Sequence, residues 1–381
     1  MNILMLEPFL GGSHKAFLEG IQQHSRHNII PVTLPGRHWR WRMHGGGVSL
    51  ALKSKELADD VDLIFASSMI NLSAFLALTR PRFDKIPVIM YMHENQITQP
   101  LPAGQVRDNT FGYLNYLNAL VADQLVFSSH FHHDSFMAAL PDFLDQFPDQ
   151  QHPDTIEWIR NASRVLHSGI DLSVFDEQPD TRNLNQHKVI VWNQRWTFDK
   201  NPGLFFRVMN RLDDAGFRFD LVLAGDNRHD KPEEFEKAWR RYGNRIIHYG
   251  YVDDIQSYSK LLHKGDIVVS TADHEFFCVA IMEAIYCGCH PVLPNRLTYP
   301  ELIPDNLRQP LLHAPILYDD EDEMFRILKD LLGNKTRRLP KTTLKKINQH
   351  LDWSRIIGKY DDLFEELAEK RAEPVHYEDG Q

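Results

Sequence analysis

Cysteine is scarce in this chain, whose 381 residues contain only three, Cys278, Cys287 and Cys289. Three thiols form no disulfide framework and lack the spacing of paired metal ligands, so we expect a reducing, cytoplasmic setting and no metal. Long hydrophobic runs are also missing, since no stretch approaches the roughly 18 apolar residues of a membrane-spanning helix. The first residues lack the basic start of a signal peptide, and their apolar run reaches Glu7 early. We therefore expect no stable membrane association.

Positive charge is in deficit as well. The 42 Lys and Arg residues stand against 52 Asp and Glu, which gives a formal net charge of -10. This balance excludes a protein held to nucleic acid by its overall charge, although it leaves room for a local basic patch. What is present is an ordinary globular composition, 43% hydrophobic and 25% charged. The length exceeds what one hydrophobic core usually serves, so we expect two domains.

Short apolar runs rich in β-branched residues alternate with amphipathic segments, and the pattern occurs twice along the chain. Strands that alternate with helices imply right-handed crossovers and buried parallel sheets. Each half therefore predicts a doubly wound α/β domain. The predicted strands are Ile3–Leu6, Ile29–Leu34, Leu63–Ala66, Val88–Met92 and Leu125–Phe127 in the first half, and Val189–Trp192, Leu221–Leu223, Ile246–Tyr249, Ile267–Val269 and Val292–Leu293 in the second.

The polar, proline-bearing stretch 176–187 predicts the boundary between the two domains. We expect an N-terminal domain over residues 1–180 and a C-terminal domain over 187–354. The segment 141–153, rich in Asp, Gln and Pro, indicates a surface excursion of the first domain. A terminal helix at about 355–375 is expected to pack back across that domain. Its apolar face consists of Ile356, Ile357, Tyr360, Leu363 and Phe364.

The segment HEFFCVAIMEA, residues 274–284, follows the predicted strand Ile267–Val269, and open α/β sheets bind ligands at the carboxyl ends of their strands. Glu275 lies in the loop, and Glu283 lies eight residues later in a helix expected to begin around Phe277. Loop amides at a helix N-terminus form an anion site, and a carboxylate accepts two hydrogen bonds from a diol. The alternative is a capped helix with a solvated face.

Two further loops offer groups for a phosphorylated ligand. In WNQRWTFDKNP, residues 192–202, Arg195 supplies a forked donor and Lys200 a point charge, which suit a diphosphate leaving group. The alternative is a pair of ordinary surface cations. In FLGGSHK, residues 9–15, the glycines Gly11 and Gly12 allow backbone N–H groups to approach a phosphate or sugar, and Ser13 is the expected helix N-cap. The three-glycine dinucleotide fingerprint is not matched, which disfavours a nicotinamide enzyme.

The strongest local indication of RNA binding is RHWRWR, residues 37–42. Residues 1–55 carry a net charge of +5, from seven Lys and Arg against two Glu. Alternating tryptophan and arginine side chains stack on bases and grip phosphates. The alternative is that the tryptophans are packed and the arginines merely solvated. The side chains concerned are Arg37, Trp39, Arg40, Trp41 and Arg42.

These segments, in this order on two α/β domains, resemble those of retaining glycosyltransferases of the GT-B type, glycosyltransferase family 4. The resemblance covers the whole chain and implies two Rossmann-like domains facing a cleft, with the acceptor on the first and the nucleotide sugar on the second. The paired glutamates of the family match Glu275 and Glu283, and its Arg–Lys pair matches Arg195 and Lys200. One departure is visible, because 276–278, Phe-Phe-Cys, stand where the family usually has glycines.

The resemblance also implies catalytic roles. Arg195 and Lys200 stabilise the departing diphosphate, and Glu275 holds hydroxyls of the donor sugar. His93 orients the sugar or contacts the acceptor, the alternative being a structural histidine near a strand end. Glu283 holds the ribose, and the strand end at 251–252 flanks the base. The residues placed around the donor are Gly11, Gly12, Tyr251, Val252, Phe277, Cys278 and Glu283.

A narrower resemblance, to the tRNA-queuosine mannosyltransferases, is carried by GGSHK, LPGRHWRWR, FASSMINL, MHENQ, LVADQLVFSS and DKNP. It implies transfer of mannose from GDP-mannose to the cyclopentenediol of queuosine in tRNA. The alternatives are another sugar nucleotide acting on a lipid or glycan, and a non-catalytic RNA-binding protein on this scaffold. The oligomeric state stays open. Besides Arg37–Arg42, the acceptor side would comprise Ser13, His14, Lys15, Glu94 and Asn95.

Overall fold

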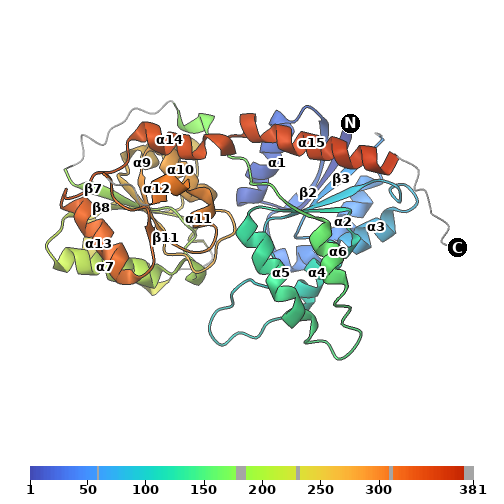
Figure 1. Ribbon diagram of the computed structural model, residues 1–381, viewed down its shortest axis with the longest axis horizontal. Helices are drawn as coiled ribbons and strands as arrows, with labels where there is room; N and C mark the ends of the chain where they lie inside the picture. The colour runs from blue at the N-terminus through green and yellow to red at the C-terminus, as the bar shows by residue number, and fades with distance from the viewer. Residues whose placement is uncertain (58–59, 177–185, 229–231, 309–311, 373–381) are drawn as a thin grey trace. The chain divides into compact units, whose positions relative to one another are not determined.

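The computed structural model describes residues 1–57, 60–176, 186–228, 232–308 and 312–372 (Figure 1). The chain forms two compact units. Unit 1 comprises residues 1–169 together with the C-terminal segment from Trp353, and unit 2 comprises residues 170–352. The division thus falls between Gly169 and Ile170, ahead of the stretch 176–187 in which we expected it and most of which lies outside the described residues.

Unit 1 contains a six-stranded parallel sheet in the order β2-β1-β3-β4-β5-β6. The five strands expected in this half are confirmed, and β3, β4 and β5 are buried throughout, as apolar strands of a parallel sheet are. The edge strand β6 was missed because its sequence, SRV, is short and mostly polar. The strands are β1 (Asn2–Leu10), β2 (Asn28–Pro35), β3 (Leu63–Ser67), β4 (Val88–Met92), β5 (Gln124–Phe127) and β6 (Ser163–Val165).

Helices cover both faces of this sheet. One face packs on α1 and α15 through the cluster that includes Ile3, Met5 and Tyr360, and the other packs on α2 to α5 through the cluster around Leu4 and Leu6. The helices of unit 1 are α1 (Gly12–His24), α2 (Trp39–Ser54), α3 (Leu72–Thr79), α4 (Asn109–Val121), α5 (His130–Leu144), α6 (Thr155–Asn161) and α15 (Trp353–Ala372).

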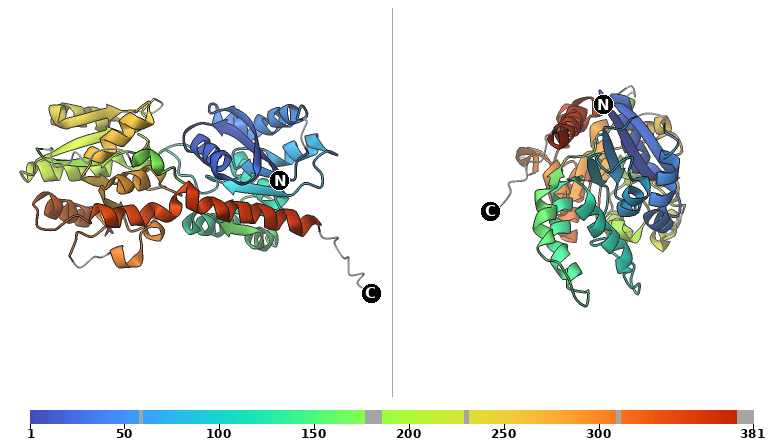
Figure 2. Two further views of the ribbon diagram at one scale, coloured as in Figure 1. Left: turned by 90° about the horizontal axis from the view of Figure 1, so that it is seen from above. Right: turned by 90° about the vertical axis from the view of Figure 1, so that its right-hand side faces the viewer.

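The terminal helix α15 packs on unit 1, as expected, and lies beside α1 in both Figure 1 and Figure 2. Its first residue, Trp353, is 2% exposed and fills a space that two glycines leave open. A Cβ atom at Gly20 would lie 2.0 Å from Trp353 Nε1, and one at Gly169 would lie 2.1 Å from Trp353 Cδ2. The two glycines therefore fix the docking of the helix.

Two local expectations in unit 1 were wrong. Helix α1 begins at Gly12 with Gly11 at the N-cap position, so Ser13 lies inside the first turn and does not cap the helix. Helix α5 continues through Pro141 to Leu144, so the surface excursion starts only after that residue. The buried side chains of Leu140 and Leu144 account for the longer helix, because they pack in the core of unit 1.

Unit 2 repeats the architecture with strand order β12-β11-β10-β7-β8-β9, again parallel. Its five expected strands are confirmed, and the two-residue edge strand β12 was missed. Cys278, Cys287 and Cys289 are buried free thiols. The strands are β7 (Lys188–Trp192), β8 (Phe219–Ala224), β9 (Ile246–Gly250), β10 (Ile267–Val269), β11 (His290–Pro294) and β12 (Leu317–Tyr318).

Alternate residues of these strands point into two separate cores. Val189, Val191 and Val268 pack against α9, α10 and α14, while Ile190 and Trp192 pack against α7, α8 and α13. The helices are α7 (Pro202–Asp214), α8 (Glu233–Tyr242), α9 (Ile255–Lys264), α10 (Val279–Cys287), α11 (Tyr299–Leu302), α12 (Asp305–Arg308), α13 (Glu321–Leu332) and α14 (Lys341–Asn348). Within the described ranges, no helix combines the length and apolar character that a bilayer crossing requires.

Candidate active site

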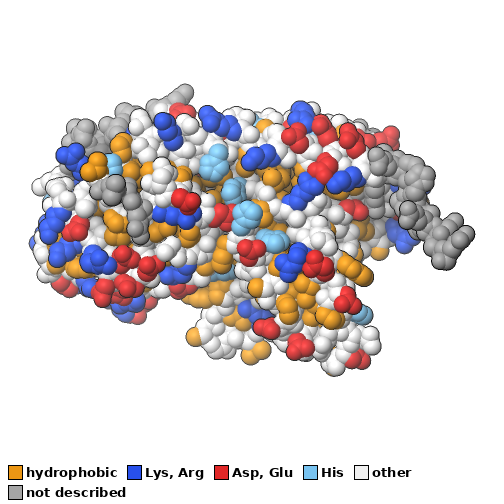
Figure 3. Space-filling view, viewed as in Figure 1, with side chains coloured by type: hydrophobic (Ala, Val, Ile, Leu, Met, Phe, Trp, Pro, Cys, Tyr) orange, Lys and Arg blue, Asp and Glu red, His pale blue; other side chains and the backbone are white. Residues whose placement is uncertain are grey.

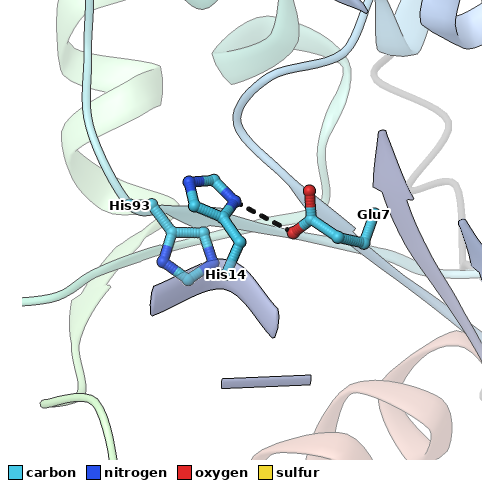
Figure 4. A group of neighbouring side chains, drawn as sticks. All are labelled: Glu7, His14 and His93. Atoms are coloured by element: carbon cyan, nitrogen blue, oxygen red, sulfur yellow. Dashed lines mark hydrogen bonds and ion pairs between the residues drawn. The ribbon is translucent and has the colours of Figure 1, made fainter. Parts of the chain in front are cut away.

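A buried acid–histidine cluster lies near the carboxyl ends of the unit 1 strands (Figure 4). Glu7 belongs to β1 and is fully buried. Its Oε1 accepts a hydrogen bond from the backbone N–H of Phe9 at 2.7 Å, and its Oε2 lies 3.0 Å from His14 Nδ1. The other ring nitrogen of His14, Nε2, lies 3.5 Å from Glu94 Oε2. The imidazole of His14 is therefore held between two carboxylates.

These contacts set the charges of two neighbouring imidazoles. Burial lowers the pKa of His14, but the charges and hydrogen bonds of Glu7 and Glu94 outweigh it and raise that pKa to about 10. His93, directly after β4, stacks on His14 with 4.1 Å between ring centroids. Burial and the adjacent His14 cation hold the pKa of His93 well below its usual range. His93 is thus neutral beside a cation, and its buried Nε2 has no hydrogen-bond partner among the described residues.

Glu7, His14 and His93 each offer one metal-ligating atom, and these atoms lie within 4.8 Å of one another. Both nitrogens of His14 already face carboxylates, however, and a metal binds only the deprotonated ring. The arrangement thus favours a hydrogen-bonded imidazolium over a metal ligand. That the protein needs no metal stays a prediction.

The loop from β1 to α1 brings two backbone segments close together. A Cβ atom at Gly36 would lie 2.7 Å from the carbonyl oxygen of Leu10, so only glycine fits there. Gly12 has a φ of +53° and open space on its Cα, which leaves its backbone accessible to a ligand. Ser13 and Lys15 are exposed, and Lys15 Nζ lies 3.6 Å from Glu19 Oε1, one helical turn along.

Asn95 orders the loop after β4. It is fully buried, and its Oδ1 accepts hydrogen bonds from the backbone N–H of Thr98 at 2.8 Å and from the Thr98 hydroxyl at 3.0 Å. The side chain orders the loop after β4, because an Asx turn of this kind needs the side-chain oxygen turned inward. The placement of Asn95 on the acceptor side stays a prediction, because its buried Nδ2 has no hydrogen-bond partner among the described residues. The side chain of Glu94 is 28% exposed.

In the run Arg37–Arg42, at the start of α2, some side chains pack against the protein and others are exposed. Trp39 is partly buried and packs on Phe111 with 5.2 Å between ring centroids. Arg42 turns back, with Nε and Nη2 each 3.3 Å from the carbonyl oxygen of Pro35. Trp41 is 64% exposed. Arg37 and Arg40 are exposed as well, and the Arg40 guanidinium lies 5.4 Å from the Trp39 ring.

In unit 2, the predicted cation Lys200 is buried in an ion-pair cluster. It lies in the short helix Phe198–Lys200, in the connection from β7 to α7, and its Nζ donates to the carbonyl oxygen of His274 at 2.6 Å. The same Nζ lies 3.1 Å from Glu275 Oε2 and 3.3 Å from Asp199 Oδ2. Lys200 and Glu275, which the sequence assigned to separate roles, therefore meet, and the lysine fixes the glutamate.

Arg195 differs from Lys200 in exposure. It lies in the loop after β7, and in the part of the chain that the structure describes its guanidinium forms no ion pair.

His274 directly precedes Glu275. Burial and the Lys200 charge lower the pKa of the His274 ring to about 4. Its Nε2 is buried without a hydrogen-bond partner among the described residues, which makes it a site candidate that sequence reasoning did not assign.

Glu283 lies in α10, which begins at Val279, slightly later than expected. Burial raises the pKa of its carboxyl to about 7, although a hydrogen bond with the Tyr258 hydroxyl partly offsets this. That hydroxyl also accepts a hydrogen bond from Asn193 Nδ2 at 2.9 Å. Phe277 is partly exposed, whereas Cys278 is 4% exposed at the N-cap position of α10.

The predicted base-flanking residues follow β9. Tyr251 is 44% exposed, and the guanidinium of Arg228 lies 4.3 Å from its ring centroid. Arg228 is fixed by Asp226, with Nη2 and Oδ2 2.6 Å apart. Val252 is partly buried against the core of unit 2. Sequence reasoning missed Asp226 and Arg228, although the polar residues directly after the strand Leu221–Leu223 were a usable indication.

Comparison with known proteins defines first the class and then the family. Residues 174–338 match the family described as glycosyl transferases group 1, so the chain is a glycosyltransferase. Residues 2–170 match the family described as tRNA-queuosine alpha-mannosyltransferase N-terminal. A tRNA-queuosine alpha-mannosyltransferase of Drosophila melanogaster is 34% identical over 312 residues, covering 80% of this chain and 82% of the relative. The chain belongs to the tRNA-queuosine alpha-mannosyltransferase family.

Solved structures show the same fold at low identity. A sucrose-phosphate synthase from Thermosynechococcus elongatus matches with a TM-score of 0.73 and 14% identity, over 97% of this chain and 100% of that one. Anabaena HepE, solved with UDP and glucose, matches with a TM-score of 0.65 and 16% identity, over 96% and 100%. The expected GT-B architecture is thereby confirmed.

Proposed function

We propose that this chain transfers mannose from GDP-mannose to the cyclopentenediol of queuosine in tRNA, with retention of the anomeric configuration. The observation that carries the proposal is the 34% identity, across most of both chains, to the Drosophila tRNA-queuosine alpha-mannosyltransferase. A GDP-mannose-dependent phosphatidylinositol dimannoside mannosyltransferase of Mycobacterium tuberculosis is 24% identical over 159 residues, covering 38% of this chain and 41% of the relative. That name supports GDP-mannose as the donor.

Unit 2 binds the donor in this proposal. Arg195 is exposed and forms no ion pair with any of the described residues, so its guanidinium is available to the diphosphate. The buried ammonium of Lys200 adds positive charge near the diphosphate. It also holds Glu275 in position for the hydroxyls of the mannose. Glu283 accepts the ribose diol, and the supported ring of Tyr251 flanks the base.

The transfer proceeds by front-face substitution. The bond between the mannose anomeric carbon and the diphosphate oxygen breaks, a bond to the acceptor hydroxyl oxygen forms on the same face, and the departing diphosphate takes the hydroxyl proton. Most of the catalytic contribution is then electrostatic, through donors already placed where negative charge develops. In unit 2 we assign this role to Arg195 as a donor and to Lys200 through its charge, since the Lys200 ammonium is already hydrogen-bonded within the protein. The Gly12 amide of unit 1 is the third predicted donor.

Unit 1 binds the acceptor. The neutral His93 offers Nε2 to a hydroxyl of the sugar or the acceptor, because no described residue occupies that nitrogen. The charge of the His14 cation beside it is compensated by Glu7 and Glu94, and this cation helps to keep His93 neutral. Exposed Arg37, Arg40 and Trp41 contact the RNA, by phosphate pairing and base stacking.

The test uses the purified chain, isotope-labelled GDP-mannose, and tRNA prepared from queuosine-replete and queuosine-deficient cells. Label on the replete tRNA alone supports the donor and the acceptor together. A parallel reaction with labelled UDP-glucose controls for donor choice. Donor binding or slow hydrolysis without label on either tRNA would reject the acceptor and direct the search to lipid and glycan acceptors.

A further inference from the structure

A basic pocket of about 520 Å³ lies in unit 2, away from the predicted donor residues. The charged and amide side chains that line it are those of Lys188, Asn334, Arg337, Arg338 and Lys341. Lys188 is the first residue of β7, whereas Arg195 follows the carboxyl end of that strand. At roughly 3.3 Å per strand residue, the five residues of β7 separate the pocket from the donor edge by about 16 Å.

The charge around this pocket is strongly one-sided. The segment 335–346, KTRRLPKTTLKK, contains six Lys and Arg and no acid, in a chain whose net charge is -10. No Asp or Glu lines the pocket. Arg338 pairs with Asp266 at 2.7 Å and Lys345 with Asp176 at 2.7 Å. The exposed side chains of Lys335, Arg337 and Lys346 make no ion pair within the described ranges, so positive charge is left uncompensated.

Part of the pocket is held rigid by the fold. Lys188 Nζ donates to the carbonyl oxygen of Leu331 at 2.6 Å and to Asn334 Oδ1, which ties β7 to the end of α13. Desolvation and, to a lesser degree, the Arg338 charge lower the pKa of Lys188, while Asp266 partly offsets both. In Figure 3 the left-hand end of unit 2, where Figure 1 shows β7 and α13, carries Lys and Arg side chains among Asp and Glu side chains.

The lining indicates what such a pocket binds. A cluster of guanidinium and ammonium groups pairs with phosphate oxygens, and a volume of this size is typical of a ligand site. The lining contains no aromatic side chain on which a base would stack. Contacts to a backbone phosphate therefore fit better than contacts to a nucleotide base. The basic segment also continues beyond the pocket to Lys345 and Lys346 on α14, so the charge extends farther than a free nucleotide.

We propose that this pocket, together with the exposed cations of 335–346, binds backbone phosphates of the RNA acceptor at a distance from the reacting sugar. The inference rests on the proposed function for its choice of tRNA as the polyanion. Contacts of this kind carry no sequence information but fix the position of the RNA and add affinity that falls steeply with salt.

The experiment compares the full chain with the charge-reversal variant Lys335→Glu/Arg337→Glu. The control is Lys237→Glu/Arg240→Glu, an equal charge reversal on exposed residues of α8. We expect the pocket variant to bind tRNA at least 10-fold more weakly, with the slope of log affinity against log salt reduced by about 1 to 2, since each lost phosphate contact contributes nearly one unit. Affinity for GDP-mannose and the melting temperature should stay unchanged.

Direct tRNA binding, measured without transfer, separates this inference from the proposed function. If the parent chain binds tRNA through the pocket yet transfers no mannose, the inference stands and the proposed activity fails. If the parent transfers mannose and the pocket variant binds tRNA as the control does, the inference is overturned and the activity stands. Absence of tRNA binding by the parent overturns both.

Discussion

Glu7 and His14 form a hydrogen bond of 3.0 Å in the interior of unit 1, with Glu7 fully buried and His14 5% exposed. A buried carboxylate is costly unless a cation compensates it, and a buried imidazolium needs a carboxylate for the same reason. The negative charge of Glu7 and the positive charge of His14 therefore stabilise each other in the interior. Glu94 adds a second negative charge on the far side of the His14 ring.

This pair makes the stability of the protein depend on pH. The pKa of His14, about 10, lies above the usual 6.5, so its proton stabilises the fold fully below about pH 6.5, and this stabilisation is lost as the pH rises toward 10. We expect the melting temperature of the parent chain to fall more steeply between pH 7 and 10 than that of His14→Gln. Thermal unfolding across that range measures it, with the exposed His44→Gln as control. Parallel curves for the parent and His14→Gln would contradict the assignment.

The same pair should affect the reaction. Glu7→Gln removes the nearer of the two charges that hold the His14 proton, so the pKa of His14 falls, and with it the pH at which the cation is lost. We expect the alkaline limb of the kcat/KM profile to move to lower pH in Glu7→Gln, with the KM for GDP-mannose little changed. An unshifted profile would assign Glu7 a purely structural role.

Arg195 and Lys200 lie on one loop, yet their replacement should have different consequences. Arg195→Ala removes an exposed donor from the leaving group, and we expect kcat to fall about 100- to 1,000-fold with an unchanged melting temperature. Lys200→Met leaves Asp199 and Glu275 without their shared cation, and breaking such a buried pair costs about 3–5 kcal/mol, so stability should fall together with activity. Thermal unfolding and kcat are measured on both variants. Equal stability losses would overturn the distinction.

The positions of ten strands and their division into two halves followed from the sequence, because strands of a parallel sheet are buried on both faces and therefore form continuous apolar runs. The edge strands β6 and β12 lack such runs. The charged pairs were harder to foresee. The apolar run of β1 ends at Leu6, which suggested that Glu7 left the strand, whereas the strand continues to Leu10 with Glu7 buried. Its burial depends on His14, and only the turn from β1 to α1 brings that partner close.

The contacts of Lys200 show the same limit of sequence reasoning. The residue type and its place after a strand predicted a cation near the donor. Its hydrogen bond to His274 and ion pair with Glu275 join positions 74 and 75 residues away in the chain. The pattern of the loop alone gave no indication that this ammonium would be buried while Arg195 stayed exposed.

Glu283 makes the stability of the protein depend on pH as well, but here burial raises the pKa, whereas in His14 neighbouring carboxylates raise it. Burial raises the pKa of its carboxyl to about 7, above the usual 4.5, so the folded state keeps a proton that the unfolded state releases. Stability should therefore fall as the pH rises from about 4.5 to 7, and Glu283→Gln should be more stable than the parent at pH 7 and above but not at pH 4.5. Thermal unfolding at both pH values checks this, and a variant of equal stability at pH 8 would refute it.

The donor should respond to the same proton. The ionised carboxylate accepts hydrogen bonds from the ribose diol on both oxygens and more strongly than the protonated acid, so the KM of the parent chain for GDP-mannose should fall as the pH rises through about 7. In Glu283→Gln the KM should be higher and independent of pH between 6 and 8, because the amide does not ionise. Initial rates at pH 6, 7 and 8 measure this. A parent KM that is flat over that range would place the ribose elsewhere.

The two tryptophans of the Arg37–Arg42 run provide a matched pair for RNA binding. Trp41 is 64% exposed, and loss of one stacked base costs about 1–3 kcal/mol, so Trp41→Ala should weaken tRNA binding roughly 5- to 150-fold with little change in melting temperature. Trp39→Ala removes packing on Phe111, so its main effect should be a lower melting temperature. Filter binding of tRNA and thermal unfolding, measured on both variants, separate stacking from packing. If Trp41→Ala binds tRNA as the parent does, the exposed ring does not contact the RNA, and recognition rests on the arginines alone.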